Sequence, residues 1–279
     1  MQKKLIAVAI AGALAAPVAI ADVAVSGSIR TGVEYTGSEW QVADNYSRLR
    51  FKSSSDLGNG QSAYMGYEFR VDSAKGSIVT GNTQRLSYVG IKGDWGSLSL
   101  GSQWSTLFNT VGTFIDKSHR FGGVGYWGNG GGQYRMKDSV AFTTQAGPVW
   151  LQADAQMNAG GDDLDRTSIG GTFAVGGASI GAAWQDNGSA DFTGVGVSMS
   201  LAGLALSGGF TDVSGVGSGY GITGSIAGVR LAYEDSDSYA DPQVWGNYAI
   251  GLGGGAKAII ELMNDGTDTA GIGMLRMDF

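Results

Sequence analysis

Hydrophobic and polar positions alternate with a period of two along most of the chain. The clearest runs are residues 23–35, 65–71, 149–154 and 194–199, where apolar side chains recur at alternate positions. Successive side chains of a strand point to opposite faces, so each run predicts a strand with one apolar face and one polar or small face. A helical period of 3.6 residues does not extend over a comparable length. The pattern predicts an all-β fold.

Short and long connections alternate between the predicted strands. The short, Gly-containing connections, typical of tight turns, are residues 56–60, 93–96, 145–148, 175–177, 200–203, 226–228 and 252–255. The longer polar stretches are residues 37–44, 72–82, 106–134, 158–165, 186–191, 212–218, 235–241 and 263–269. Together they predict sixteen strands, the last of which ends at Phe279.

Two all-β architectures compete for this pattern. A soluble sandwich buries its apolar faces and turns its polar faces to water. Here only 15% of the residues are charged, against about 25% in an average soluble domain. A membrane barrel has an apolar outer band with aromatic girdles, short turns at one end and long loops at the other. Aromatic residues close to predicted turns or loops, suited to such girdles, are Tyr35, Trp95, Trp104, Trp184, Tyr233 and Tyr248.

Backbone hydrogen bonding favours a closed barrel. Unpaired N–H and C=O groups are costly in lipid, so only helices and closed barrels span a bilayer. Beyond the first residues, the chain has no run of about 18 apolar residues that would form a spanning helix. We therefore predict a transmembrane antiparallel β-barrel of sixteen strands, with short periplasmic turns and long outer loops.

The first 21 residues have the form of an export signal. Lys3 and Lys4 precede an apolar run at residues 5–16, and residues 19–21 form an Ala-Ile-Ala cleavage site. The apolar run is too short to span a bilayer as a helix. We expect residues 1–21 to be a cleaved signal peptide and residues 22–279 to be a single barrel domain. The alternative is a buried N-terminal helix.

Composition excludes several function classes. The chain has no Cys, which excludes disulfide scaffolds, thiol enzymes and Cys-based zinc sites. Its one His, His119, excludes His-rich metal sites. The formal net charge of −7 excludes a strongly basic protein that binds nucleic acid.

Several motifs together resemble the Gram-negative general porin family. They are residues 25–33, residues 48–52 with the turn at 56–60, residues 85–91 with the strand at 96–101, residues 134–140, and the terminal Phe279 preceded by Leu275 and Met277. The resemblance implies a sixteen-stranded barrel that associates in threes in the outer membrane. It also implies that the third long loop, here residues 106–134, folds into the lumen and narrows it.

The resemblance also implies which residues form the pore constriction. Arg48, Arg85 and Arg135 match the family's basic cluster on the wall opposite the third loop. Arg50 and Lys52 share the strand face of Arg48. The full predicted set is Arg30, Arg48, Arg50, Lys52, Arg85, Asp116 and Arg135.

The loop departs from the family pattern in its acidic residues. Thr113–Lys117 replaces a Pro-Glu-Phe-Gly-Gly stretch, and Ser102 stands where the family has an Arg. Asp116 is the only carboxylate within residues 106–134. The acidic side of the constriction is therefore expected to be thinner than is usual in the family.

Three further motifs have weaker interpretations. Residues 123–128 spell G-x-G-x-x-G, but the Gly-rich residues that follow cannot open the helix that a dinucleotide site needs. Ser118 and His119 are adjacent, which does not by itself supply the geometry of a catalytic triad. The acidic clusters at 162–165 and 235–237 have oxygen ligands that suit Ca²⁺, although neither has EF-hand spacing.

The sequence thus predicts a passive, water-filled channel for small hydrophilic solutes and ions, without a cofactor. Its expected partners are outer-membrane lipid, lipopolysaccharide and two further copies of the chain. A substrate-specific porin and an outer-membrane barrel enzyme are the alternatives. The sign of the ion preference is left open, because acidic outer loops and basic wall residues act in opposite directions.

Overall fold

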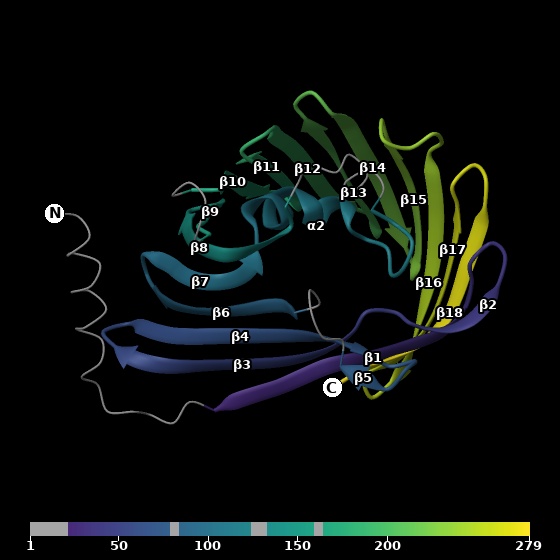
Figure 1. Ribbon diagram of the computed structural model, residues 1–279, viewed down its shortest axis with the longest axis horizontal. Helices are drawn as coiled ribbons and strands as arrows, with labels where there is room; N and C mark the ends of the chain where they lie inside the picture. Colours follow the sequence, from purple (N-terminus) through teal and green to yellow (C-terminus); the bar gives the residue numbers. More distant parts are fainter. Residues whose placement is uncertain (1–21, 79–83, 124–132, 159–163) are drawn as a thin grey trace.

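The computed structural model describes residues 22–78, 84–123, 133–158 and 164–279. Within them, the chain forms one antiparallel sheet. Its first strand, β1 (Val23–Tyr35), pairs with its last, β18 (Thr269–Asp278), from Ser28 opposite Asp278 to Tyr35 opposite Gly271. The sheet therefore closes into a barrel, which Figure 1 shows as a ring of strands. The predicted signal peptide, residues 1–21, lies outside the described residues.

Sixteen long strands form the wall, which confirms the predicted fold and strand number. The other fifteen are β3 (Ser47–Gly58), β4 (Gln61–Asp72), β6 (Gln84–Gly93), β7 (Gly96–Trp104), β8 (Arg135–Ala146), β9 (Val149–Gln156), β10 (Arg166–Val175), β11 (Ala178–Asp186), β12 (Asp191–Leu201), β13 (Leu204–Val213), β14 (Gly217–Ile226), β15 (Val229–Ser236), β16 (Gln243–Gly253), β17 (Ala256–Asn264) and β18. Two short strands, β2 (Trp40–Asp44) and β5 (Ser77–Ile78), form within predicted loops and pair with β1 and β4.

Seven two-residue turns lie at one end of the barrel, which we call the turn end. Five of them have positive φ at both residues, as at Ala202 (50°) and Gly203 (83°). This geometry matches the right-handed twist of the flanking strands. The opposite end is the loop end. There, residues 187–190, 214–216 and 265–268 form the shortest connections between long strands. The Val216 N–H closes its turn on the Val213 carbonyl at 2.9 Å.

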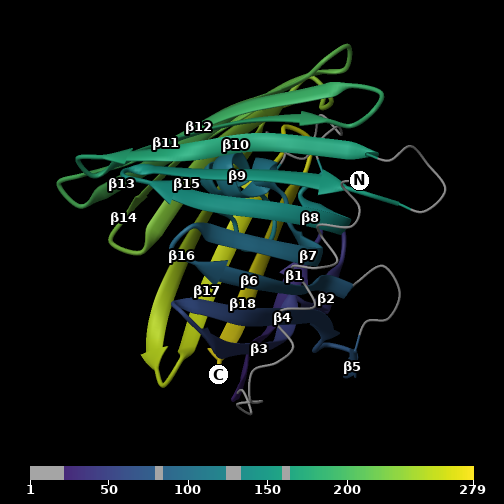
Figure 2. The same cartoon turned by 90° about the vertical axis from the view of Figure 1, so that its left-hand side faces the viewer.

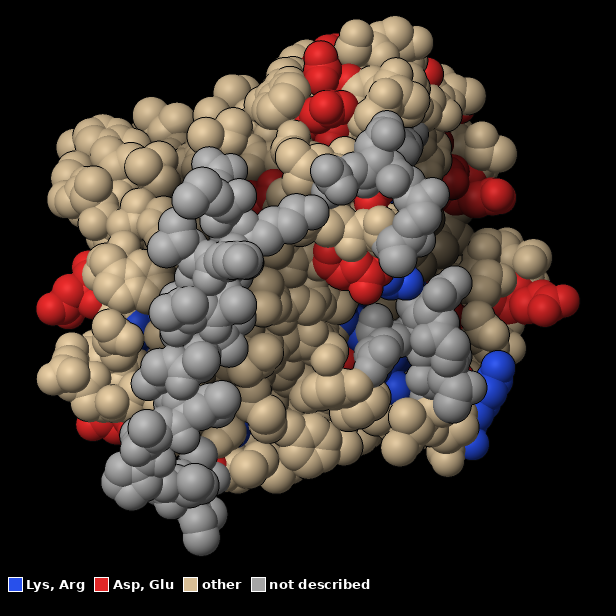
Figure 3. Space-filling model, turned by 60° about the vertical axis from the view of Figure 1, so that its left-hand side comes forward, with Lys and Arg blue, Asp and Glu red and all other residues tan. Residues whose placement is uncertain are grey.

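Alternation places apolar side chains on the outside of the barrel. Val195, Val197 and Met199 of β12 are exposed outside, whereas the inner side of Gly194 and Gly196 contacts Val111 and Phe114. The strands are strongly tilted in Figure 2, and most of the face in Figure 3 is uncharged. No helix in the described ranges is long and apolar enough to cross a membrane.

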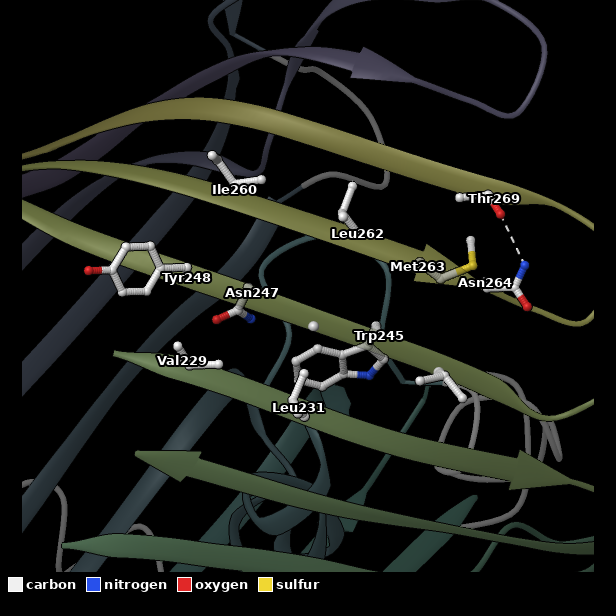
Figure 4. A pocket seen from close by; sticks show the side chains of 12 residues that line it. Val229, Leu231, Trp245, Asn247, Tyr248, Ile260, Leu262, Met263, Asn264 and Thr269 are labelled. Carbon is white, nitrogen blue, oxygen red and sulfur yellow. Dashed lines mark hydrogen bonds between the residues drawn. The ribbon is translucent and has the colours of Figure 1, made fainter. Parts of the chain in front are cut away.

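A shallow depression of about 500 Å³ lies on the outer surface over β15, β16 and β17 (Figure 4). It forms because Gly246, which faces outward, is paired between Leu231 and Leu262. Tyr248 and Ile260 also line it. The depression belongs to the apolar outer band and is no candidate for a hydrophilic solute.

Candidate functional site

The chain turns into the barrel after β7. Residues 105–123, here called the inner segment, contain the π-helix η2 (Phe108–Gly112) and the short helix α2 (Thr113–Ile115). Figure 1 shows α2 inside the ring of strands. The buried side chains of Leu107, Val111 and Ile115 form one apolar cluster with wall residues such as Phe192. The inner segment is therefore packed on the wall and does not hang free in the lumen.

Glycines on the inner face of the wall let the inner segment approach closely. A Cβ added at Gly181 would stand 1.8 Å from the carbonyl oxygen of Thr110, and one at Gly196 would stand 2.4 Å from the ring of Phe114. Any larger residue at either position would push the segment toward the centre of the lumen. The width of the lumen beside α2 depends on these glycines.

Buried Glu261 of β17 holds the inner segment by its backbone. Its carboxylate accepts the N–H groups of His119, Arg120 and Phe121 at 2.7, 2.7 and 2.9 Å. The side-chain amide of Asn247 donates a fourth hydrogen bond at 2.9 Å. Hydrogen bonds to an ionised carboxylate are about twice as strong as neutral ones. Glu261 thus fixes three successive residues of the segment to the wall.

Two more buried carboxylates fix the ends of the inner segment. Asp154 of β9 accepts from the backbone N–H and the hydroxyl of Thr106 at 2.5 and 2.6 Å. Glu234 of β15 accepts from the Gly123 N–H at 2.6 Å. Donors of the segment itself satisfy these wall carboxylates, which lie beneath it, so their charge is kept away from the lumen.

Arginines gather on the opposite wall around Glu68 of β4. The Nε atoms of Arg50 and Arg85 each lie 2.5 Å from a Glu68 carboxylate oxygen, and Nε of Arg48 lies at 3.8 Å. One carboxylate thus faces three guanidinium groups. The cluster keeps an excess of positive charge.

A cavity of about 390 Å³ separates this wall from the inner segment. We call it the arginine cavity. Its charged lining residues are Arg30, Arg48, Arg85, Arg120, Arg135 and Asp116. Arg120 comes from the inner segment and forms a bidentate ion pair with buried Glu34, with N···O distances of 2.6 and 2.9 Å. Cations therefore outnumber carboxylates along this passage.

A β-bulge turns Arg85 inward. In the pairing of β4 with β6, Glu68 lies opposite Leu86 and Phe69 lies opposite Gln84, so Arg85 has no partner of its own. Strict alternation with the exposed Val89 would place Arg85 on the outer face. Bulges re-aim side chains in this way. The bulge brings the Arg85 guanidinium to Glu68 and into the cavity.

The predicted site residues occupy three kinds of position. Arg30, Arg48, Arg85, Asp116 and Arg135 line the arginine cavity. Arg50 lies behind it, paired with Glu68. Lys52 is exposed farther toward the turn end and does not line the cavity.

Sequence reasoning missed Glu68, Glu34 and Glu261 as parts of the site. Glu68 could have been found, because it alternates on the polar face of its strand and the hairpin register places it opposite Arg50. Glu261 gave no such signal, since the backbone N–H groups that it binds are about 140 residues away in the sequence.

Trp104 was predicted for the outer aromatic girdle, and this prediction is wrong. Its ring stacks on Phe108 with centroids 4.0 Å apart and lines the arginine cavity. The guanidinium carbons of Arg85 and Arg135 lie 5.5 and 5.7 Å from its centroid. Trp104 is the last residue of β7, where the chain bends inward, so its side chain follows the inner segment. Trp95, Trp184, Tyr233 and Tyr248 are exposed on the outside, as girdle residues should be.

Titratable groups of the inner segment respond to burial in the lumen. Burial raises the pKa of Asp116 above its usual value, although Arg48, Lys117 and Arg85 oppose the rise. Burial also lowers the pKa of His119, with Glu261 acting in the opposite direction. A neutral His119 adds no positive charge to the cavity at neutral pH.

For the three weaker motifs, the described residues offer no support for a catalytic or metal-binding role. His119 and Ser118 both line the cavity, but among the described residues no serine hydroxyl is hydrogen-bonded to the His119 ring. The Asp237 carboxylate accepts from the Ser218 backbone and hydroxyl at 2.7 and 3.0 Å. In the described part of the chain, no three metal-ligating side chains gather. Residues 124–128 of the Gly-rich motif, and Asp162 and Asp163, lie outside that part.

The chain belongs to the Gram-negative porin family, whose model matches residues 7–251. The resemblance seen in the motifs is thereby confirmed. The chain is 39% identical over 126 residues to the major outer membrane protein P.IB of Neisseria gonorrhoeae, covering 39% of this chain and 34% of that protein. The matching region of the Neisseria lactamica protein of the same name is 36% identical over 126 residues. The chain thus spans about a third of the length of these curated relatives.

Solved porin structures share the whole fold. An anion-selective porin from Comamonas acidovorans superposes with a TM-score of 0.76 at 18% identity, over 93% of this chain and 100% of that one. OmpF of Salmonella typhi, in a complex with daunomycin, gives a TM-score of 0.74 at 14% identity, over 93% and 97%. Family and fold together identify this chain as a β-barrel of the Gram-negative outer membrane.

Proposed function

We propose that the chain forms a water-filled channel through which small hydrophilic solutes and ions diffuse passively, with a preference for anions. The observation that carries the proposal is the arginine cavity, where five arginines and one aspartate line a passage of about 390 Å³. A sixteen-stranded barrel is wide enough to leave an aqueous channel. Rings and clusters of one charge sign set the ion preference of such a pore.

The magnitude of the charge imbalance supports an ion preference without tight binding. Two charges 4 Å apart interact by about 4 kcal/mol at an effective dielectric constant of 20. Salt in the lumen screens this charge–charge interaction, with a Debye length of about 10 Å at 0.1 M. The electrostatic potential of the arginine cavity favours the entry of anions over cations. Because the lumen is filled with water, the ions are not held tightly and can leave. A channel, not catalysis, is the activity that this arrangement supports.

We further propose that the barrel acts as a homotrimer surrounded by outer-membrane lipid and lipopolysaccharide. The uncharged outer surface suits contact with lipid and with other copies of the chain. The carboxylates of Asp235, near the loop end of β15, and of Asp237, in the loop that follows, are candidates for a lipopolysaccharide-bridging Ca²⁺. Calcium titration of the purified protein would test this.

Planar-bilayer recording tests the proposed channel. The purified protein should give stepwise conductance and a reversal potential on the anion side in a KCl gradient. Replacing two cavity arginines, in Arg48→Glu with Arg85→Glu, should move the reversal potential toward cations. His119→Ala should leave the conductance nearly unchanged, because its ring takes no part in the charge cluster. A wild-type protein without stepwise conductance, or with a cation preference, would overturn the proposal.

A further inference from the structure

A second pocket lies on the far side of the inner segment from the arginine cavity. It measures about 200 Å³ and opens among the strands β12 to β15 near the turn end. Two cations, Lys117 and Arg230, line it together with hydroxyl-bearing side chains of the wall. Lys117 directly follows Asp116 in the inner segment. Asp116 lines the arginine cavity, and Lys117 lines the second pocket.

The hydroxyl groups form a row across three neighbouring strands. Ser198 of β12 lies opposite Ser207 of β13, which lies opposite Thr223 of β14. Adjacent strands are about 4.8 Å apart, so the row offers hydrogen bonds at regular steps. Ser225, opposite Arg230 on β15, continues it toward the turn end. Hydroxyls both donate and accept, which suits the oxygens of a hydrated anion.

The two cations of this pocket are not neutralised by an ion pair. A terminal nitrogen of Arg230 donates to the backbone carbonyl of Lys117, which fixes the guanidinium beside the loop. Within the described ranges, neither side chain is within ion-pair distance of a carboxylate. Burial and the positive charge of Arg230 lower the pKa of Lys117, with Asp116 opposing. An anion between them would relieve this repulsion.

Several donors of the pocket are free to meet such an anion. Ser207 already donates to the Phe114 carbonyl at 2.8 Å. By contrast, the hydroxyls of Ser198 and Ser225 have no hydrogen-bond partner among the described residues. A volume of 200 Å³ corresponds to about seven water molecules at roughly 30 Å³ each. That space fits a small oxyanion with part of its hydration shell.

We propose that Lys117, Arg230 and the hydroxyls of Ser198, Thr223 and Ser225 form a weak binding site for small oxyanions, in series with the arginine cavity. The site rests on the proposed channel function and refines its substrate class. An anion that passes the arginine cavity would next meet Lys117. Binding to this second site would bring the anion closer to the turn end. Oxyanions gain more than chloride does from such a site, because several of their oxygens can accept hydrogen bonds at once.

Single-channel recording with added inorganic phosphate tests this site. In wild-type protein in KCl, phosphate should reduce the chloride current saturably. Lys117→Gln should raise the half-inhibiting phosphate concentration about tenfold, equivalent to ~1.4 kcal/mol. Ser198→Ala with Ser225→Ala, which keeps every charge, should also raise it. Lys52→Gln removes an equal lumenal charge on the opposite side of the barrel and should leave it unchanged.

The outcomes separate this site from the channel itself. If phosphate does not inhibit the wild type, or inhibits Lys117→Gln and Lys52→Gln equally, the oxyanion site is refuted. The proposed channel would survive either result, because it depends on stepwise conductance and on the reversal potential in KCl, both measured without phosphate. A phosphate effect lost in Lys117→Gln but kept in the double serine variant would refute the role given to the hydroxyl row.

Discussion

Two buried glutamates of the barrel wall, Glu68 on β4 and Glu261 on β17, have opposite surroundings although only β18, β1 and β3 separate their strands. Glu68 is 5% exposed and meets three arginine side chains. Glu261 is 0% exposed and meets three backbone N–H groups and one amide. The first carboxylate is overcompensated by charged side chains at the border of the lumen. The second is satisfied by neutral donors that belong to the inner segment.

The comparison shows that the sign of a buried charge does not by itself decide the charge of a pore. Glu261, Asp154 and Glu234 lie under the inner segment, where their negative charge serves to position it. Glu68 organises arginines whose excess charge faces the passage. The carboxylates beneath the inner segment thus hold it in place, and the arginines around Glu68 determine the electrostatic potential of the lumen. The partners of each carboxylate determine which role it has.

The largest expected effect is the loss of the Glu261 anchor. In Glu261→Ala, three backbone N–H groups and the Asn247 amide lose their acceptor, and each buried donor left unpaired costs about 1–3 kcal/mol. Lumenal water can replace only part of this. The inner segment should move between positions, and single-channel recordings should show frequent transitions between current levels.

Two matched variants sharpen this test. Glu261→Gln keeps one acceptor oxygen and should give an intermediate number of transitions. Glu39→Ala removes an exposed glutamate of the first outer loop and should leave the recording quiet. A quiet recording from Glu261→Ala would show that other contacts suffice to hold the segment.

A smaller effect is expected when Glu68 loses its charge. Glu68→Gln leaves three arginines without a counter-charge and should raise the anion-to-cation permeability ratio about threefold, since lumenal salt screens part of the change. Arg50→Gln removes a cation from the same cluster and should shift the reversal potential the other way. Shifts of the same sign in both variants would contradict the electrostatic role of this wall.

The sequence predicts the wall of the barrel far better than the contents of its lumen. Period-two alternation and Gly-containing turns depend on residues that are close in sequence, and they located all sixteen strands. The inward position of Arg85 depends on a bulge, which alternation cannot predict. Trp104 was misplaced for a related reason, because the chain leaves the regular strand at that residue.

Unlike Glu68, the buried Glu261 could not be assigned to the site from the sequence. Asp116 was expected to supply the acid of the constriction, since it is the only carboxylate of the loop. Most of the buried acid instead comes from wall strands, and Glu261 lies about 140 residues beyond the backbone it binds. Closure of the barrel brings these residues together, so only the folded geometry shows the pairing.

The smallest expected effect concerns Asp116, which borders the lumen and, among the described residues, has no wall partner of the kind that Glu68 and Glu261 have. Because burial raises its pKa, Asp116 should take up a proton at a higher pH than an ordinary aspartate. Acidification then removes one negative charge from the arginine cavity, so the anion preference should rise slightly as the pH falls below neutral. Reversal potentials measured along a pH series would show this rise in the wild type. Asp116→Asn should start at the higher preference and lose this component of the pH response, whereas an identical pH response in both proteins would mean that other carboxylates cause it.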